Sequence, residues 1–194
     1  SADTPSEAEE SMISCALQIL AQAIELLRSS AIGDEELSTP SQGASGATVG
    51  KHLRHVLDHY RLLLDSVEAA PNGGQPFIDY DRRVRSVPIE TSVQSALQEF
   101  EYTQRRIRSV LATPADGSVT PTMERVVTLQ ATTPIIQEFK STIGREVWHV
   151  ALHSIHHFAL ARVILNELGL GDAVGKEFGV APSTLALRQW ARES

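Results

Sequence analysis

Residues 141–165 read STIGREVWHVALHSIHHFALARVIL, a helix-length segment with four histidines in nine residues. At about 100° per residue, all four fall within an arc of roughly 100° on one side of such a helix. His153 and His157 are spaced i,i+4, so their rings project side by side and can hold one ion. An adjoining apolar stripe comprises Trp148, Leu152, Ile155, Ala159 and Val163. The segment predicts either a polar helix edge or one half of a metal site.

A second predicted helix, over residues 45–68, carries the other three histidines. His52, His55 and His59 share an arc of about 60° beside an apolar face. All seven histidines of the chain therefore lie in two short windows, residues 52–59 and 149–157. If the two helices pack against each other, their histidine rows meet, and a divalent ion satisfies imidazoles that are costly to bury without partners.

The remaining chain predicts an all-α four-helix bundle of the up-down type. Helical spacing marks residues 13–28 and 90–110 as the other two helices, and a polar, Gly/Ser-rich loop joins the first two. Two β-branched runs, 124–131 and 134–140, predict a small β-hairpin or an extended pair before the fourth helix. The tail, residues 180–193, predicts a short last helix capped by Ser183. We expect one domain over residues 1–194, with 1–10 as a flexible N-terminal segment.

Composition narrows the function classes. The net charge of −7 argues against general phosphate-backbone binding, so no nucleic-acid partner is expected. The apolar runs are too short to predict a membrane span, and the acidic N-terminus lacks secretory-signal features. The single cysteine, Cys15, excludes an intrachain disulfide and a thiolate-type zinc finger. We expect a cytoplasmic protein.

The donor set points to one class of ion. Imidazoles without thiolates, and with few carboxylates nearby, favour zinc, nickel, cobalt or iron over magnesium or calcium. Three imidazoles with an open position are typical of a catalytic site. A metal-free polar layer and bis-histidine haem ligation are the competing interpretations.

Three ordered motifs resemble the DinB-like metalloprotein superfamily. They are GKHLRH at residues 50–55, YDRRVR at 80–85, and REVW followed by HSIHH at 145–148 and 153–157. The resemblance covers roughly residues 10–190. It implies a four-helix bundle in which one histidine of the second helix and an HxxxH pair of the fourth bind a divalent cation.

Carried onto this chain, the resemblance implies metal ligands at His55, His153 and His157. His52 is the alternative on the second helix, and His156 is a further alternate that lines the site or binds from the other side. Residues expected to orient the ligands from outside the ligand set are His59, His149 and Glu146.

The superfamily includes thiol-dependent S-transferases and a thiol-dependent isomerase. The resemblance therefore implies a small metal-dependent enzyme that uses one divalent transition-metal ion, zinc in first place. The ion would activate a thiol or water for attack on an electrophilic small molecule. Asp81, Arg83 and Arg85 are candidate substrate-contacting groups, in a pocket lined also by Tyr80 and Trp148.

Two other functions fit the same motifs. One is a non-catalytic metal-binding or stress-response module in which the ion stabilises the bundle. The other is a metal-dependent hydrolase or isomerase. The expected partners are a small-molecule substrate, including a low-molecular-weight thiol, and a second copy bound through a helix face as a homodimer. No membrane partner is expected.

Overall fold

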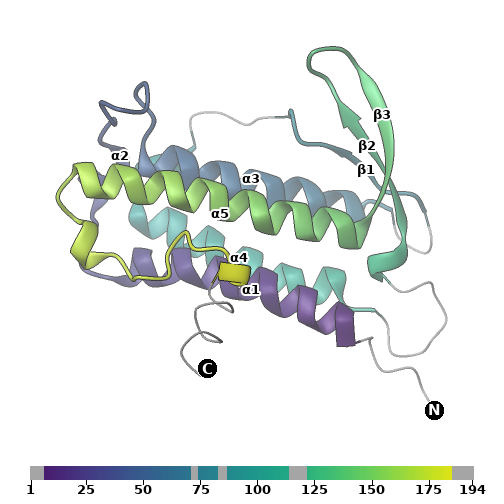
Figure 1. The fold of residues 1–194 in the computed structure, drawn as a ribbon. Helices are drawn as coiled ribbons and strands as arrows, with labels where there is room; N and C mark the ends of the chain where they lie inside the picture. Colours follow the sequence, from purple (N-terminus) through teal and green to yellow (C-terminus); the bar gives the residue numbers. More distant parts are fainter. Residues whose placement is uncertain (1–6, 71–73, 83–86, 114–121, 185–194) are drawn as a thin grey trace.

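The computed structural model describes residues 7–70, 74–82, 87–113 and 122–184 of the 194-residue chain. The described part is mostly helical, as the sequence predicts, and it also contains a small three-stranded sheet. Four long helices lie side by side (Figure 1). They are α1 (Glu7–Arg28), α3 (Val49–Glu68), α4 (Val93–Leu111) and α5 (Ile143–Glu167). Shorter helical elements are α2 (Asp34–Ser38), η1 (Pro88–Glu90), η2 (Thr122–Glu124) and η3 (Gly171–Ala173).

Three of the long helices begin at a hydroxyl side chain. The hydroxyl oxygens of Thr48, Ser92 and Thr142 each accept a hydrogen bond from the backbone N–H three residues later, at 3.0 to 3.2 Å. Such caps satisfy amides that have no partner inside the helix. They fix the start of α3 and α5, and therefore where each histidine row begins.

The core lies between the long helices. α3 packs against α4 and α5, and α1 packs against the same two helices. Tyr60, Phe100 and Phe158 are the largest fully buried side chains, and leucine, isoleucine, valine and alanine fill the space around them. Burial of this apolar surface is the main source of stability.

The apolar stripe of α5 faces the core only in part. Ile155 is buried, but Trp148, Leu152 and Val163 are exposed by 57%, 40% and 53%. The face that packs into the core lies beside it and includes Val147, Val150, Ala151, Phe158 and Leu165. Both sides of α5 carry apolar residues, so periodicity alone does not distinguish the buried side.

The expected hairpin before the last long helix is present. β2 (Val126–Ala131) and β3 (Gln137–Thr142) pair antiparallel, and the second expected run is displaced because Ile135 and Ile136 belong to the turn. A third strand, β1 (Phe77–Asp79), pairs parallel with β2. The sequence did not predict β1, because a three-residue strand whose partner lies about fifty residues away has almost no local signal.

Several expected boundaries need correction. α1 begins at Glu7, so residues 7–10 of the expected flexible segment are helical, while residues 1–6 lie outside the described part. The expected loop between the first two long helices contains α2. The expected last helix lies largely outside the described residues, which end at Thr184.

By length and composition, α1 is apolar enough to cross a membrane. Half of that apolar window is buried inside the protein. Nine of its residues are buried, including Ile19, Leu20 and Ala23. This is the pattern of a core helix, and it is weak evidence for a membrane span.

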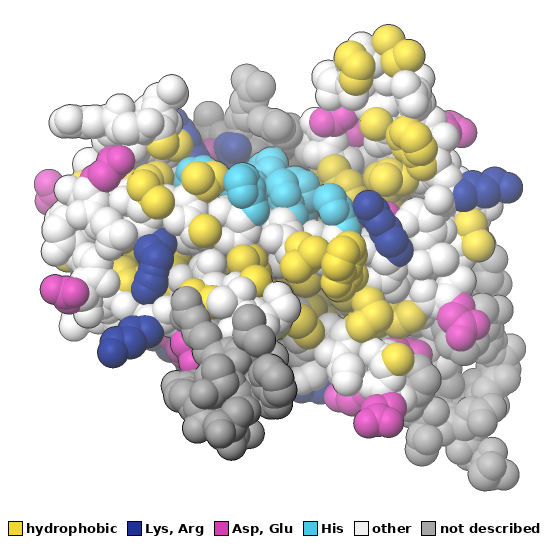
Figure 2. All heavy atoms as spheres, viewed as in Figure 1, with side chains coloured by type: hydrophobic (Ala, Val, Ile, Leu, Met, Phe, Trp, Pro, Cys, Tyr) yellow, Lys and Arg dark blue, Asp and Glu magenta, His cyan; other side chains and the backbone are white. Residues whose placement is uncertain are grey.

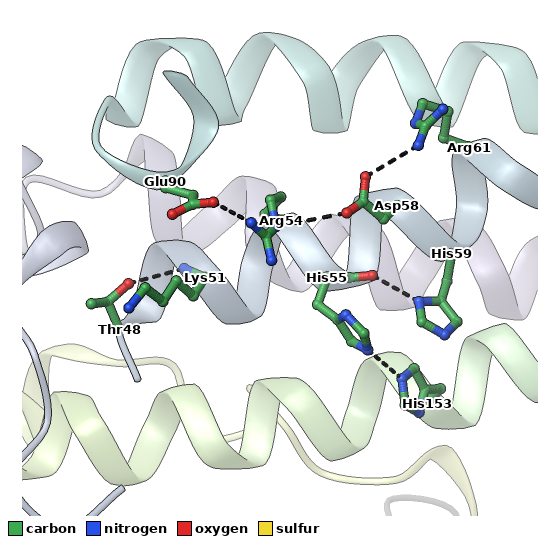
Figure 3. Close-up of polar contacts among 9 residues, drawn as sticks. All are labelled: Thr48, Lys51, Arg54, His55, Asp58, His59, Arg61, Glu90 and His153. Atoms are coloured by element: carbon green, nitrogen blue, oxygen red, sulfur yellow. Dashed lines mark hydrogen bonds and ion pairs between the residues drawn. The ribbon is translucent and has the colours of Figure 1, made fainter. Parts of the chain in front are cut away.

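The start of α3 touches the backbone of η1. A Cβ atom added at Gly50 would lie 2.1 Å from the carbonyl oxygen of Glu90, so no larger residue fits without a backbone shift. Arg54, one turn further along α3, forms an ion pair with the Glu90 carboxylate and lies 3.7 Å from Asp58. These contacts fix α3 on the side opposite its histidines (Figure 3).

Candidate metal centre

The two predicted histidine rows meet where α3 packs against α5. Side chains from both helices form one continuous band of histidines on the surface (Figure 2). His59 is buried at 6% exposure, His156 is exposed, and the other five are half-buried. The band is therefore partly exposed to solvent, while burial desolvates some of its imidazole rings.

Three of these histidines converge at one point. Nε2 of His153 lies 3.1 Å from Nε2 of His55 and 3.1 Å from Nε2 of His157. Within the described residues, these three side chains form a group whose ligand nitrogens all lie within 4.8 Å of one another. Figure 3 shows His55 reaching from α3 towards His153 on α5.

Hydrogen bonding alone does not account for this convergence. Each imidazole nitrogen has one in-plane position, which holds either a proton or a lone pair. Nε2 of His153 can therefore make a good hydrogen bond with one of its two neighbours, but not with both. Three lone pairs directed at one cation resolve the conflict.

The spacing also fits a metal ion. Zinc binds imidazole nitrogens at about 2.0–2.1 Å, which in a tetrahedron places two ligand nitrogens about 3.3–3.4 Å apart. The two distances of 3.1 Å at His153 are close to that edge. Three nitrogen donors leave at least one coordination position without a protein ligand from this trio.

His52 contacts the trio from outside. Its Nδ1 lies 2.8 Å from Nδ1 of His157, so one of these nitrogens donates a proton to the other. If Nε2 of His157 keeps its lone pair for an ion, its Nδ1 carries the proton and His52 accepts it. Nε2 of His52 is buried and has no hydrogen-bond partner among the described residues. His52 is thus placed to orient His157.

His59 is fixed by two contacts. Its Nδ1–H donates to the backbone carbonyl of His55 at 2.9 Å, which leaves its Nε2 unprotonated in the neutral ring. Its ring stacks on Tyr80 with centroids 4.9 Å apart, and it lies 4.3 Å from the His153 ring. His59 therefore borders the trio from the buried side.

Burial favours the neutral form of four histidines in the band, because it lowers their pKa values. Desolvation, followed by the neighbouring imidazoles, lowers the pKa of His153 to about 4. The same causes lower the pKa of His157 further, to about 2. Desolvation also lowers the pKa of His52 and His149. At neutral pH these rings hold lone pairs, which is the state that binds a metal.

The two remaining histidines lie at the margin. His156 is exposed, and its ring lies 5.0 Å from that of His157 and 6.0 Å from that of His153. His149 stacks on His153 at 5.8 Å and lies at the same distance from Tyr80. Neither belongs to the convergent trio.

Glu146 is fully buried and lies below this end of the band. Its Oε1 accepts hydrogen bonds from the Ser141 hydroxyl at 2.6 Å and from Arg145 at 2.8 Å. Burial and this carboxylate together raise the pKa of the adjacent Tyr80 hydroxyl. Among the described residues Glu146 bonds no imidazole, but its charge acts directly on His149, where it partly offsets the lowering of the pKa by burial and by Arg145.

The predicted substrate-contacting groups are only partly described. Asp81 accepts hydrogen bonds from the backbone N–H and the hydroxyl of Thr132, which fastens the end of β1 to the hairpin. Arg83 and Arg85 lie outside the described residues. Trp148 is exposed on α5 and lines a hollow of about 440 Å³ with Met12 and Met123. A substrate role for these residues stays a prediction.

Sequence reasoning missed how α3 is anchored. Arg54 and Asp58 are spaced i,i+4, which is a readable signal for an ion pair on one helix. Their connection to Glu90 depends on a contact between distant segments, for which the sequence has no local signal.

Comparison with known proteins identifies the family of the chain. A protein from Rhizopus delemar described as "FK506-binding protein 5" is 34% identical over 108 residues. That alignment covers 56% of this chain and 26% of the relative, so the chain matches about a quarter of the relative's length. No solved structure matches the chain closely enough to count as a relative. The family model of the DinB superfamily matches residues 18–161, which include all seven histidines, and on this match the chain belongs to the DinB superfamily.

Proposed function

We propose that this chain is a metal-dependent enzyme whose ion is held by His55, His153 and His157. The observation that carries the proposal is the pair of 3.1 Å contacts at Nε2 of His153. A single imidazole nitrogen can make only one good hydrogen bond, so hydrogen bonding does not explain both contacts. Superfamily membership supports the same ligand set. In this proposal the four long helices form a four-helix bundle, and residues 1–194 form one domain.

Zinc is the first choice of ion, with nickel, cobalt and iron as alternatives. A bound divalent ion would lower the pKa of a thiol or water and so supply a nucleophile near neutral pH. The half-buried band of histidines supports access by a small molecule. In the reaction we propose, the thiol sulfur bonds to the electrophilic atom, the leaving group departs with its electron pair, and the thiol proton passes to solvent.

The surrounding residues would hold the ligand rings in place. His52 would accept the Nδ1 proton of His157, at the 2.8 Å contact between them. His59, fixed by the His55 carbonyl and the Tyr80 ring, would bound the site on its buried side. The substrate is a small electrophile, the co-substrate a low-molecular-weight thiol, and the setting cytoplasmic.

Metal analysis is the decisive experiment. The purified protein should contain about one equivalent of a divalent transition metal per chain, as measured by inductively coupled plasma mass spectrometry. His55→Ala, His153→Ala and His157→Ala should each lose it, whereas His156→Ala, on an exposed neighbouring histidine, should retain it. Full metal content in all three trio variants would show that the ligand assignment is wrong.

Thiol dependence is tested separately. The cobalt-substituted protein should develop a sulfur-to-cobalt charge-transfer absorption when glutathione or another small thiol is added. The loaded protein should then accelerate conjugation of that thiol to an electrophile. Absence of both effects with every thiol tried would reject the transferase assignment while leaving the metal site intact.

One observation favours a non-catalytic metal-binding module instead. The neutral tautomer of His59 leaves Nε2 unprotonated, and its ring lies 4.3 Å from that of His153. A fourth imidazole in the shell would close it, as in structural sites. X-ray absorption spectroscopy of the zinc protein counts imidazoles and water directly: three imidazoles with a water favour catalysis, and four favour the module.

A further inference from the structure

The sheet ends in an exposed strand. The strand order is β1-β2-β3, so β3 is an edge, and the hairpin projects beyond the helices (Figure 1). Residues 137–140 of β3 are all exposed. Within the described ranges, β3 packs mainly on β2 and the start of α5. An exposed edge of this kind offers backbone N–H and C=O groups to another strand.

The hydrogen-bond pattern shows which residues face that edge. The Ile143 N–H donates to the Arg125 carbonyl at 3.0 Å, in the same register as the β2–β3 ladder. Antiparallel strands bond at alternate residues, so Ser141, Phe139 and Gln137 bond to β2. The backbone groups of Glu138 and Lys140 therefore point to the open edge.

We propose that β3 pairs antiparallel with β3 of a second copy of this chain, about a two-fold axis at Phe139. In such a pair, residues whose backbone groups point to the open edge must lie opposite each other. Three registers centred on residues 138–140 meet this condition. Two of them place Glu138 against its own copy or Lys140 against its own copy, and like charges directly opposite are unfavourable. The third places Glu138 opposite Lys140, and does so twice because the axis is two-fold.

Side-chain charge supports this register. Glu138 and Lys140 are two residues apart and therefore lie on the same face of the strand. Both are exposed, and neither has an ion-pair partner within the described residues. Pairing with a second copy gives each of them a partner of opposite charge across the new ladder.

Apolar side chains support the same surface. On the other face of the sheet, Ile78 of β1 is buried, Leu129 of β2 is partly buried and Phe139 of β3 is 48% exposed. The apolar face thus runs out to the edge, where a second Phe139 would continue it. Ile135 and Ile136, exposed by 63% and 72%, flank the strand at the turn. Figure 2 shows hydrophobic side chains gathered on the projecting hairpin.

The contact is small. Two six-residue strands bury less than the roughly 800 Å² per partner of a standard interface, so we expect a dissociation constant on the order of 100 µM. The dimer would carry one continuous sheet of six strands. This surface differs from the helix-face dimer expected from the sequence, and it does not depend on the metal site.

Charge reversal tests the register. Sedimentation equilibrium between about 10 µM and 1 mM protein should detect the dimer. The dissociation constant should be that of a weak complex, because the interface is small. Glu138→Lys and Lys140→Glu should each raise the dissociation constant at least about tenfold, because each creates like-charge pairs at both sites. The double variant should restore the dimer, and an equimolar mixture of the two single variants should associate.

Matched controls separate register from net charge. Glu177→Lys and Lys176→Glu change the net charge by the same amounts at exposed positions after α5, and they should leave the dissociation constant unchanged. Far-UV circular dichroism confirms that each variant is folded. A monomer throughout the concentration range, single variants that associate like the parent, or a double variant that stays monomeric would each overturn the proposal.

Discussion

Proteins usually bury apolar side chains and expose titratable ones. Two regions depart from this rule in opposite ways: the histidine band between α3 and α5, and the β2–β3 hairpin. The band places titratable imidazoles in half-buried positions, such as His55 and His153. The hairpin leaves Ile135 and Ile136 largely in water. Where the local pattern breaks the general rule, function is the first explanation to test. The two proposals accordingly assign a small ligand to the band and a flat partner, a second β-strand, to the hairpin.

The largest effect should follow removal of the shared ligand in the band. His153→Ala should lower zinc affinity by more than the roughly 10–100-fold expected for residues that only orient a ligand, because both 3.1 Å contacts are lost. Competition with a chromophoric chelator at pH 7.5 measures the change. An affinity within threefold of the parent protein would place the site elsewhere.

Acid should lower the stability of the metal-free protein, and His153 in the band should account for part of this effect. The pKa of His153 is about 4 in the folded chain, against an ordinary 6.5. Between these values the unfolded chain binds more protons, so the free energy of unfolding rises with pH and falls as pH drops from 6.5 towards 4. Urea unfolding of metal-free protein across this range measures the slope. The slope should be shallower in His153→Asn, and an equal slope would show that His153 is not responsible.

A smaller effect is expected at His52. Its Nδ1 contacts His157 but it lies outside the trio, so His52→Ala should lower zinc affinity by about 10–100-fold. His52→Gln, which keeps an acceptor oxygen, should recover part of the loss. If His52→Ala instead removed the metal as completely as His153→Ala, His52 would be a ligand and not an orienting residue.

The smallest effect belongs to the hairpin. Ile136→Ser should change the free energy of unfolding by less than about 0.5 kcal/mol, because the side chain is 72% exposed. The contrasting variant is Ile143→Ala, at a position with no exposure, which should cost about 2–5 kcal/mol. Urea titrations compare the two. A loss above 1 kcal/mol for Ile136→Ser would mean that the turn packs against another part of the chain.

Sequence patterns predict the helices well because their signals are local. Spacing near 3.6 residues places α3 and α5, and the two histidine windows follow directly from it. Periodicity alone cannot choose between His52 and His55, because both lie on the same side of one helix. The grouping of His55 with His153 and His157 was therefore expected only from the family resemblance. Only the packing of α3 on α5 brings the nitrogen of His55 to His153.

Features that depend on distant contacts escape such reasoning. The parallel pairing of β1 with β2, and the link from Arg54 to Glu90, join segments far apart in the chain. The apolar residues of α5 do not by themselves mark its buried side, because Trp148 and Leu152 are apolar yet exposed. Which side of an amphiphilic helix packs inward is decided by the neighbouring helices and not by the helix itself.

The close approach at Gly50 has a mechanical consequence for the histidines. The backbones of α3 and η1 can come this close only because residue 50 has no side chain, so a larger residue there would displace α3 or η1. His55 is five residues further on, about 7.5 Å along the helix, and a slide of one residue would move it by about 1.5 Å. The ligands of a metal site must stay within about 0.5 Å of their productive positions. If Gly50→Ala displaced α3 by even part of that distance, it would weaken the proposed metal site without changing any of its ligands.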